Sequence, residues 1–427
     1  MTDEPAVPPL RRPQRGSVRS GERVLAPDVA RGLMLLLIVL SNTGFHLYAA
    51  QHGPSGWHPV DGSALDRVAQ FAMITALDMR TYPLFAFLFG YGMMQLFRRQ
   101  TAAGTSERGA AALLRRRGVW LIVFGFAHAA LLMAGDILGA YGVASLVAGM
   151  LFLRRTDRTM LVGAGVLFLL LIVTSALGAY GTVPGDPDGS GVVPSTVYYA
   201  SNEPDALAAV GTRLSTWLFV AFGGGLLGFS FHTVMLLGFW AARNRVLEEP
   251  ERHLTLLRTT AVAGVAVGWA GGLPQALAHV GAIDVPAAMI VEAGPFAAIQ
   301  TVTGVFGGLG YVAAVVLACR ALPVRLRQGT AVTAVAAVGR RSLSCYLAHS
   351  LVFAPVLAAW GLGLGAVMGS ATVALFAFGV WLLTVAGAYA LERKGWRGPA
   401  EAVLRRLVYG RVERPHEPAP VPAEPRP

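Results

Sequence analysis

Charged residues are scarce in this sequence of 427 residues. Asp, Glu, Lys and Arg make up 14% of the chain, whereas about 25% is usual in soluble globular domains. Hydrophobic residues make up 54%, and the mean hydropathy is +0.55. Apolar stretches of about 20 residues, long enough to cross a bilayer as a helix, recur along the whole chain. These properties exclude a string of soluble domains and predict an all-α, polytopic membrane protein with about ten transmembrane helices.

Cysteine is also scarce, and familiar catalytic motifs are missing. The two cysteines are Cys319, at the cytoplasmic end of one expected span, and Cys345, in the next. A structural disulfide is not expected in that compartment. The sequence has no Cys/His spacing typical of zinc, no nucleotide-binding loop, no Gly-x-Ser-x-Gly elbow and no metal-binding helix. We therefore expect no metal and no tightly bound cofactor.

Basic residues are distributed very unevenly along the chain, whose net charge is +11. The segments expected in the cytoplasm hold 32 of the 35 Lys and Arg residues, and the exceptions are Arg67, Arg80 and Arg213. This is the positive-inside pattern, and it predicts that both termini are cytoplasmic. The basicity therefore indicates topology and contact with anionic membrane lipids, and a nucleic-acid partner is not expected.

The composition changes along the chain predict four regions. Residues 1–23 form a disordered basic cytoplasmic tail, 24–391 a transmembrane helical domain, 392–411 an amphipathic helix on the inner leaflet, and 412–427 a second disordered tail. The first apolar run follows a long basic leader without a clear cleavage site, so we expect it to remain as the first span. The expected spans lie near 30–50, 81–97, 118–134, 137–153, 159–180, within 204–241, and near 259–280, 295–319, 335–359 and 368–391.

Polar groups on the first span form the first candidate site, because ionisable side chains within a membrane usually face the bundle interior and have a partner or a task. Asp28 and Arg31 lie one helical turn apart. They are either a helix-start acid beside a topological arginine, or an arginine held to meet phosphate oxygens. Asn42 and His46 follow four residues apart, as hydrogen-bonding contacts between helices or, for His46, as a general base. His52 and His58 lie in the outer loop beyond.

His128 and Asp136 form the second candidate site. On one continuous helix, eight residues would place them on the same face, about 12 Å apart along the axis. A buried histidine near a carboxylate is suited to proton transfer. A structural polar network is the alternative, and the sequence does not choose between them.

Three further residues stand out at the ends of spans or inside them. Arg80 lies at the outer side of the second span, where Asp66, Asp78 and Asp136 are candidate partners. Arg340 belongs to the sequence GRRSLSCYLAHS and marks the cytoplasmic edge, and His349 lies deeper in the same segment. From the residues alone, the chain is a membrane enzyme or a transporter with polar groups on both sides of the bundle.

Four stretches together resemble a bacterial family, the YeiB-like proteins with the domain of unknown function 418. They are DVARGLMLLLIVLSN, RTYPLFAFLFGYG, GFAHAALLMAGDILGAYG and the ending VGRRSLSCYLAHS…GWRGPAEAVLRRLVYG. The C-terminal half of the family would correspond to about residues 235–410. The resemblance implies a multi-pass protein of the bacterial cell membrane.

That family is similar to a wider group of transmembrane acyltransferases, which includes the acyltransferase-3 proteins and heparan-α-glucosaminide N-acetyltransferase. The resemblance implies helices around a central cavity, acyl-CoA as a cytoplasmic co-substrate, and a hydroxyl or amine acceptor outside, such as an envelope glycan or lipid. Acyltransferase-3 proteins have a histidine where this chain has Asn42, which ten residues separate from Arg31, and the heparan-type enzymes are similar to this chain there. The base is therefore unassigned among His46, His52, His58 and His128.

The favoured hypothesis is acyl transfer, and the alternatives are transport of a small solute through the same polar cavity or a lipid-binding role without turnover. Asp28 would orient Arg31 towards the donor's phosphates, His128 with Asp136 would act as the base, and Asn42 would donate to the developing oxyanion. The candidate catalytic residues are His128, Asp136, Asn42 and His46, and the candidate donor-binding residues are Asp28, Arg31, Arg80, Arg340 and His349.

Overall fold

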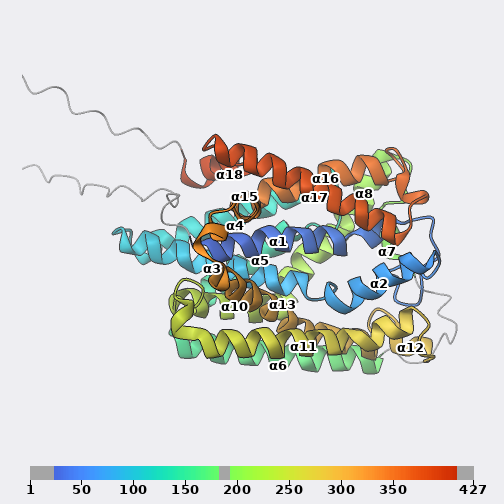
Figure 1. The fold of residues 1–427 in the computed structure, drawn as a ribbon, viewed down its shortest axis with the longest axis horizontal. Coiled ribbons are helices and arrows are strands. Elements are labelled where there is room, and N and C mark those ends of the chain that lie inside the picture. Colours follow the sequence, from blue (N-terminus) through green and yellow to red (C-terminus); the bar gives the residue numbers. More distant parts are fainter. Residues whose placement is uncertain (1–23, 182–192, 411–427) are drawn as a thin grey trace, which may run out of the picture.

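The computed structural model describes residues 24–181 and 193–410. The two predicted tails lie outside these ranges, as does the stretch 182–192 in the connection that follows the fifth predicted span. Within them the regular structure is helical, apart from one isolated bridge between His52 and Pro59. The long helices run in the same general direction, along the horizontal axis of Figure 1. The all-α prediction is confirmed for this part of the chain.

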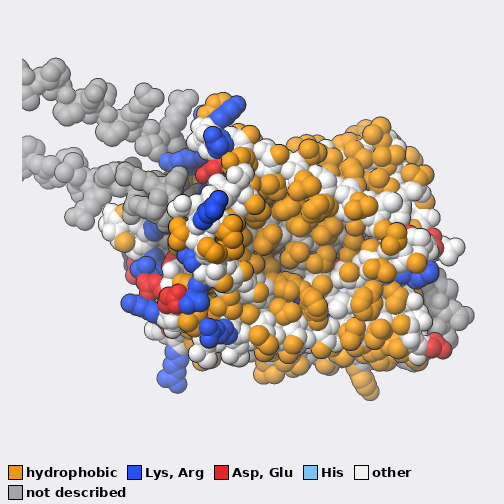
Figure 2. Space-filling model, in the orientation of Figure 1, with side chains coloured by type: hydrophobic (Ala, Val, Ile, Leu, Met, Phe, Trp, Pro, Cys, Tyr) orange, Lys and Arg blue, Asp and Glu red, His pale blue; other side chains and the backbone are white. Residues whose placement is uncertain are grey.

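Six helical segments in the described residues are long and apolar enough to cross a membrane. They are Leu25–His46, Asp157–Gly181, Ala206–Leu227, Pro250–His279, Ala287–Ala321 and Ser370–Arg393, and three shorter apolar helices accompany them, Ile137–Phe152, Thr330–Arg340 and Ser342–Leu357. In Figure 2 hydrophobic side chains cover the broad middle of the visible face, and Lys and Arg gather at one end. The chain is therefore a multi-pass membrane protein.

The spans predicted near 81–97, 137–153 and 159–180 agree with helices of the structure to within a few residues, whereas the helices at the spans predicted near 30–50 and 118–134 begin and end earlier. The bounds are α1 Leu25–Ser41, η2 Thr43–His46, α2 Ala64–Ala76, α3 Thr81–Ala102, α4 Glu107–Leu131, α5 Ile137–Phe152 and α6 Asp157–Gly181. At three of these helix starts a polar side chain accepts a hydrogen bond from a backbone N–H group. The accepting side chains are Ser63 before α2, Ser106 before α4 and Asp136 before α5. Such caps satisfy amide groups that the helix itself leaves free. α1 begins earlier than expected, so Asp28 and Arg31 lie within its first two turns.

The predicted sixth span, within 204–241, is divided in the structure. α8 (Ala206–Leu218) continues through the π-helical η3 (Phe219–Gly224) and α9 (Gly225–Leu227), and α10 (Phe229–Arg243) follows. The break falls at Gly228, whose backbone leaves the helical region with ψ at 79°. The prediction of one span with a short lead-in did not include this break, which lies in the glycine-rich stretch before Ser230.

The C-terminal half adds a second division. Its helices are α11 Leu254–His279, α12 Ala287–Ile290, α13 Pro295–Ala321, α14 Val324–Arg327, α15 Thr330–Arg340, α16 Ser342–Leu357, α17 Ser370–Arg393 and α18 Pro399–Tyr409, and short segments lie at α7 Ser195–Tyr198, η4 Pro250–His253 and η5 Leu364–Ala366. The predicted span at 335–359 is thus two helices that meet at Arg341, whose guanidinium bonds back to the carbonyls of Ala337 and Trp396. The predicted helix at 392–411 is α18, and it is shorter because α17 continues to Arg393.

Close packing of small residues joins some of the helices. α11 lies beside α13, and a Cβ added at Gly268 would fall 2.6 Å from the Cα of Gly307. Such small residues allow helix backbones to approach closely within a membrane. A side chain at Gly268 would therefore push α11 and α13 apart.

Candidate functional site

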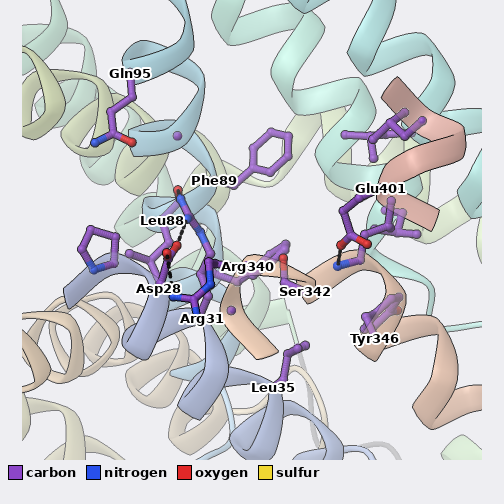
Figure 3. Close-up of a pocket in the computed structure, with 18 of the residues that line it drawn as sticks. Asp28, Arg31, Leu35, Leu88, Phe89, Gln95, Arg340, Ser342, Tyr346 and Glu401 are labelled. Carbon is purple, nitrogen blue, oxygen red and sulfur yellow. Dashed lines mark hydrogen bonds and ion pairs between the residues drawn. The ribbon is translucent and has the colours of Figure 1, made fainter. Parts of the chain in front are cut away.

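A cavity of about 260 Å³ lies among α1, α3, α4, α15, α16 and α18, at the basic end of the bundle (Figure 3). Apolar side chains form much of its wall, including Leu35, Ile38 and Leu121. The polar residues that line it are Asp28, Arg31, Gln95, Arg99, Arg117, Arg340, Ser342, Tyr346 and Glu401. Four guanidinium groups and two carboxylates thus share the wall that the described residues form, and the positive excess suits a ligand with several negative charges.

Asp28 lies between two arginines of this wall. Its Oδ1 atom is 3.4 Å from Nη1 of Arg31, and its Oδ2 atom is 3.8 Å from Nη1 of Arg340. Arg31 also donates to the backbone carbonyl of Leu88 at 3.2 Å. The contact between Asp28 and Arg31 that the sequence predicted is therefore present, and Arg340 joins it. These bonds fix the direction of both guanidinium groups beside the cavity.

The position of α15 depends on this region of α1. A Cβ added at Gly339 would fall 1.8 Å from the backbone oxygen of Asp28, so only glycine allows the two helices to approach this closely. Arg340 and Arg341 then form ion pairs with Glu392 at the end of α17, at 3.0 and 2.7 Å. Arg340 is thereby anchored from two sides, by Asp28 and by Glu392.

α18 covers one side of the cavity. The carboxylate of Glu401 accepts hydrogen bonds from the backbone N–H groups of Leu343 and Ser344, at 2.8 and 3.2 Å, and from the Ser344 hydroxyl. These amides are at the first turn of α16, where a negative charge is favourable. Leu404, one turn further along α18, also lines the cavity. The amphipathic helix α18 therefore lies at the basic end of the bundle and is held against α16 by Glu401.

His128 and Asp136 contact each other directly behind the inner wall of the cavity. His128 Nδ1 is 2.8 Å from Asp136 Oδ1, and the side chains are 1% and 0% exposed. The other carboxylate oxygen accepts from Gly139 N at 2.8 Å and from Trp217 Nε1 at 3.3 Å. The predicted axial separation of about 12 Å is wrong, because α4 ends at Leu131 and Asp136 caps the next helix.

Tyr346 separates this pair from the cavity. Its ring lies 5.2 Å from the His128 ring, its oxygen accepts a hydrogen bond from Ile137 N at 3.3 Å, and both Tyr346 and Ile137 line the cavity. A carboxylate can only accept at Nδ1, so neutral His128 carries its proton there and a lone pair on Nε2. Among the described residues, Nε2 has no hydrogen-bond partner. His128 Nε2 could therefore accept a proton, and the Tyr346 side chain lies between it and the cavity.

The structure places the remaining candidates away from the cavity. Asn42 follows the last residue of α1, and His349 contacts the Thr384 hydroxyl at 3.2 Å between α16 and α17. His46 borders a void of about 10 Å³, with Met133 and Arg213 across from it. Both ring nitrogens of His46 are buried and lack a partner among the described residues.

Arg80 has a structural environment that the sequence did not predict. Its side chain is fully buried and donates to the backbone carbonyls of Gly268, Ile74 and Asp78. The carboxylates expected to pair with it bond elsewhere: Asp66 to Ser63 and Ala371, Asp78 to Ser41 and His58, and Asp136 to His128. Arg80 thus connects α3 with α11 and lies outside the cavity.

Sequence reasoning missed Gln95, Arg99, Arg117 and Glu401 as cavity residues. The arginines were counted only as topological charges. The N-cap at Ser106 is the signal that could have identified Arg117, since it starts α4 early enough to carry position 117 into the bundle. The Arg117 guanidinium carbon lies 5.6 Å from the centre of the Phe89 ring, inside the wall. Arg116, its neighbour, is exposed.

Comparisons with known proteins find a family match and similar bacterial proteins. Residues 241–411 match the family described as protein of unknown function (DUF418). The chain is 26% identical to the uncharacterized protein YxaH of Bacillus subtilis, over 91% of this chain and 95% of that protein. It is also 26% identical to the uncharacterized protein YeiB of Escherichia coli, over 90% of this chain and 96% of that protein. The chain therefore carries a DUF418 domain that supplies one side of the cavity, and it is homologous to YxaH and YeiB over most of its length.

Proposed function

We propose that the protein is a membrane acyltransferase, which takes an acyl group from cytoplasmic acyl-CoA and transfers it to a hydroxyl or amine acceptor on the other side of the membrane. The observation that carries this proposal is the arginine-lined cavity, whose inner wall at Tyr346 adjoins the His128–Asp136 dyad. The acceptor would belong to an envelope glycan or lipid. The proposal includes a topology of ten spans with both termini in the cytoplasm.

The cavity suits the donor because its two ends differ in character. Arg31, Arg99, Arg117 and Arg340 supply guanidinium groups, which match phosphate oxygens in geometry and charge. Leu35, Ile38 and Leu138 provide an apolar wall along which an acyl chain would lie. In this arrangement the phosphates stay at the basic end and the thioester carbon points towards Tyr346.

The dyad would then transfer a proton during the reaction. Nε2 of His128 takes the proton of the acceptor hydroxyl or amine as the acceptor oxygen or nitrogen bonds to the acyl carbon. The C–S bond breaks, and the CoA thiolate leaves with the proton from His128. Asp136 holds the ring through Nδ1 and stabilises the imidazolium. Asn42 lies outside the cavity, so it cannot donate to the oxyanion. We propose that the Tyr346 hydroxyl donates this hydrogen bond instead.

A test in lipid nanodiscs compares two histidines. Hydrolysis of radiolabelled acetyl-CoA, with water as the acceptor, is measured for His128→Gln and for His253→Gln, whose histidine contacts a cytoplasmic-loop carbonyl. Loss of a general base lowers kcat by about 100-fold or more. We therefore expect this loss in His128→Gln, with an unchanged KM, and normal turnover in His253→Gln.

Two results would contradict the proposal. Failure of the purified protein to bind acetyl-CoA would remove the donor, and equal turnover in both variants would remove the dyad from the reaction. Flux of a small anion through proteoliposomes without any turnover would favour the transporter. A transporter and the proposed acyltransferase both need a path from the cavity to the outer face, and it would pass Ile137, Leu138 and Tyr346 of the inner wall.

A further inference from the structure

A second, smaller pocket lies at the end of the molecule opposite α18, beside α12 (Figure 1). It has a volume of about 100 Å³. The loop after α1, the last turn of α11 and α12 form it, and its lining residues are Pro54, Ser55, Val60, Gln275, Ala278, His279 and Ile290. Val60 is 41% exposed, so the rim of the pocket reaches the surface. No candidate site predicted from the sequence includes this pocket.

The buried polar atoms of the pocket are hydrogen-bond acceptors. Gln275 is only 6% exposed, and its Nε2 atom donates to the carbonyl of Ile290 at 3.0 Å. Its Oε1 atom is buried without a hydrogen-bond partner among the described residues. A buried amide oxygen left unpaired is unfavourable by about 1–3 kcal/mol. A ligand that donates to this oxygen would remove that penalty.

His279 adds a second acceptor. Its Nε2 atom lies 2.9 Å from the backbone oxygen of Pro59. A carbonyl oxygen can only accept, so the neutral ring carries its proton on Nε2 and has a lone pair on Nδ1. The pocket therefore combines two acceptors with apolar contacts from Pro54, Ala278 and Ile290.

The surroundings of His279 are fixed by a hydrogen-bond chain. The His58 ring lies 5.9 Å from the His279 ring. Nε2 of His58 is 2.7 Å from Asp78 Oδ2, and the Ser41 hydroxyl donates to the other carboxylate oxygen at 2.8 Å. These bonds hold the loop that carries Pro59, so the pocket is formed before any ligand arrives. Within the described residues, no group of His, Cys, Asp or Glu side chains could hold a metal ion.

We propose that this pocket binds a small neutral alcohol or polyol whose hydroxyl donates to Gln275 Oε1, while a second hydroxyl of a polyol would donate to His279 Nδ1. The lining that the structure describes contains no carboxylate, so an ammonium group in the pocket would lose its hydration without a direct ion pair in exchange. The volume corresponds to roughly three water molecules in the liquid, which is enough for one hydroxyl-bearing group of a few atoms. The inference is independent of acyl transfer, because it concerns residues far from the arginine cavity.

The experiment uses a matched pair of fluorinated probes on the full chain in nanodiscs, without acyl-CoA. Binding of 2-fluoroethanol is followed by ¹⁹F NMR, with 2-fluoroethylamine as the charged probe of equal size. We expect saturable binding of the alcohol and weaker binding of the ammonium. Gln275→Met removes the acceptor while keeping the volume, and should weaken alcohol binding about tenfold. Gln300→Met is the control. Gln300 lies on α13, outside the pocket, where it is equally buried and donates to Ile74 O.

Each outcome decides the matter. Equal affinity in the wild-type chain and Gln275→Met, or a loss of the same size in Gln300→Met, would overturn the site. Tighter binding of the ammonium than of the alcohol would overturn the ligand class, and no saturable binding of either probe would remove the pocket as a binding site. Thermal unfolding of each variant shows that it is folded. None of these results affects acetyl-CoA turnover, so the two proposals fail separately.

Discussion

Single side chains decide what the arginine cavity can bind. Arg31 and Arg340 share Asp28, so part of their charge is already balanced within the protein. Arg117 instead stacks over the Phe89 ring, which orients its guanidinium, and the Glu401 carboxylate acts on it only at a longer range than an ion pair. Arg117 is therefore the arginine from which an anionic ligand should gain a large share of its binding energy.

Neighbouring arginines on α4 provide a test of that role. Arg117→Gln should weaken CoA binding to the protein in nanodiscs by about tenfold or more, because a charge-assisted hydrogen bond is lost. Arg116→Gln removes the same charge one residue away, on an exposed side chain, and should change the affinity less than twofold. Isothermal titration with CoA measures both. Equal losses would mean that only the overall charge of the basic end matters.

Contacts between residues close in the sequence were easier to predict than contacts between distant segments. Asp28 with Arg31 is a local pair on one helix, and spacing alone places the two together. Arg80 was different, because its neighbours come from a helix almost two hundred residues away, as in its bond to Gly268. Every residue has a backbone carbonyl, so a residue pattern does not show which carbonyls accept from an arginine. A buried arginine that donates to carbonyls therefore cannot be distinguished by sequence from one that binds a ligand.

Among the helices, α18 has the most direct effect on the cavity. It is short and basic, and Glu401 holds it by occupying the amide groups at the start of α16. Neighbouring Ser344 strengthens the contact, since its oxygen also accepts from Ala400 N at 3.0 Å. One carboxylate therefore joins the amphipathic helix to the wall that also carries Arg340.

Neutralising this carboxylate should loosen α18. In Glu401→Gln the amide groups of Leu343 and Ser344 lose a charged acceptor, at a cost of about 1–3 kcal/mol. Hydrogen–deuterium exchange of the amides in α18 should become at least severalfold faster, while α11 exchanges as before. Glu203→Gln, at a half-buried glutamate outside the helices whose carboxylate accepts from Asp205 N, serves as the control. Unchanged exchange in α18 would show that Leu404 and Val408, which are buried, hold the helix without Glu401.

Helix ends were predictable where polar residues mark them, and helix breaks inside apolar segments were not. Ser63, Ser106 and Asp136 cap helices in the manner their side chains suggest. The break at Arg341 coincides with the close approach of α15 to α1 at Gly339, and the break at Gly228 lies within an apolar segment. A membrane-buried segment is apolar on all faces, so periodicity gives no information about where it bends.

For the whole molecule, the two proposed sites lie at opposite ends of the bundle. The arginine cavity adjoins α18, and the pocket at Gln275 adjoins α12, as Figure 1 shows. The distribution of Lys and Arg assigns the first end to the cytoplasm. If that assignment holds, a phosphate-bearing ligand reaches the cavity from inside the cell and a neutral hydroxyl compound reaches the pocket from outside.

Cysteine labelling in spheroplasts tests this orientation directly. Both native cysteines are buried, and they are replaced by alanine before single cysteines are introduced. Asp284→Cys lies in the exposed loop between α11 and α12, and Arg154→Cys in the exposed turn between α5 and α6. A membrane-impermeant maleimide should label position 284 in intact spheroplasts and position 154 only after lysis. The reverse pattern would place the arginine cavity outside the cell, where acyl-CoA is not available, and the acyltransferase proposal would fail with it.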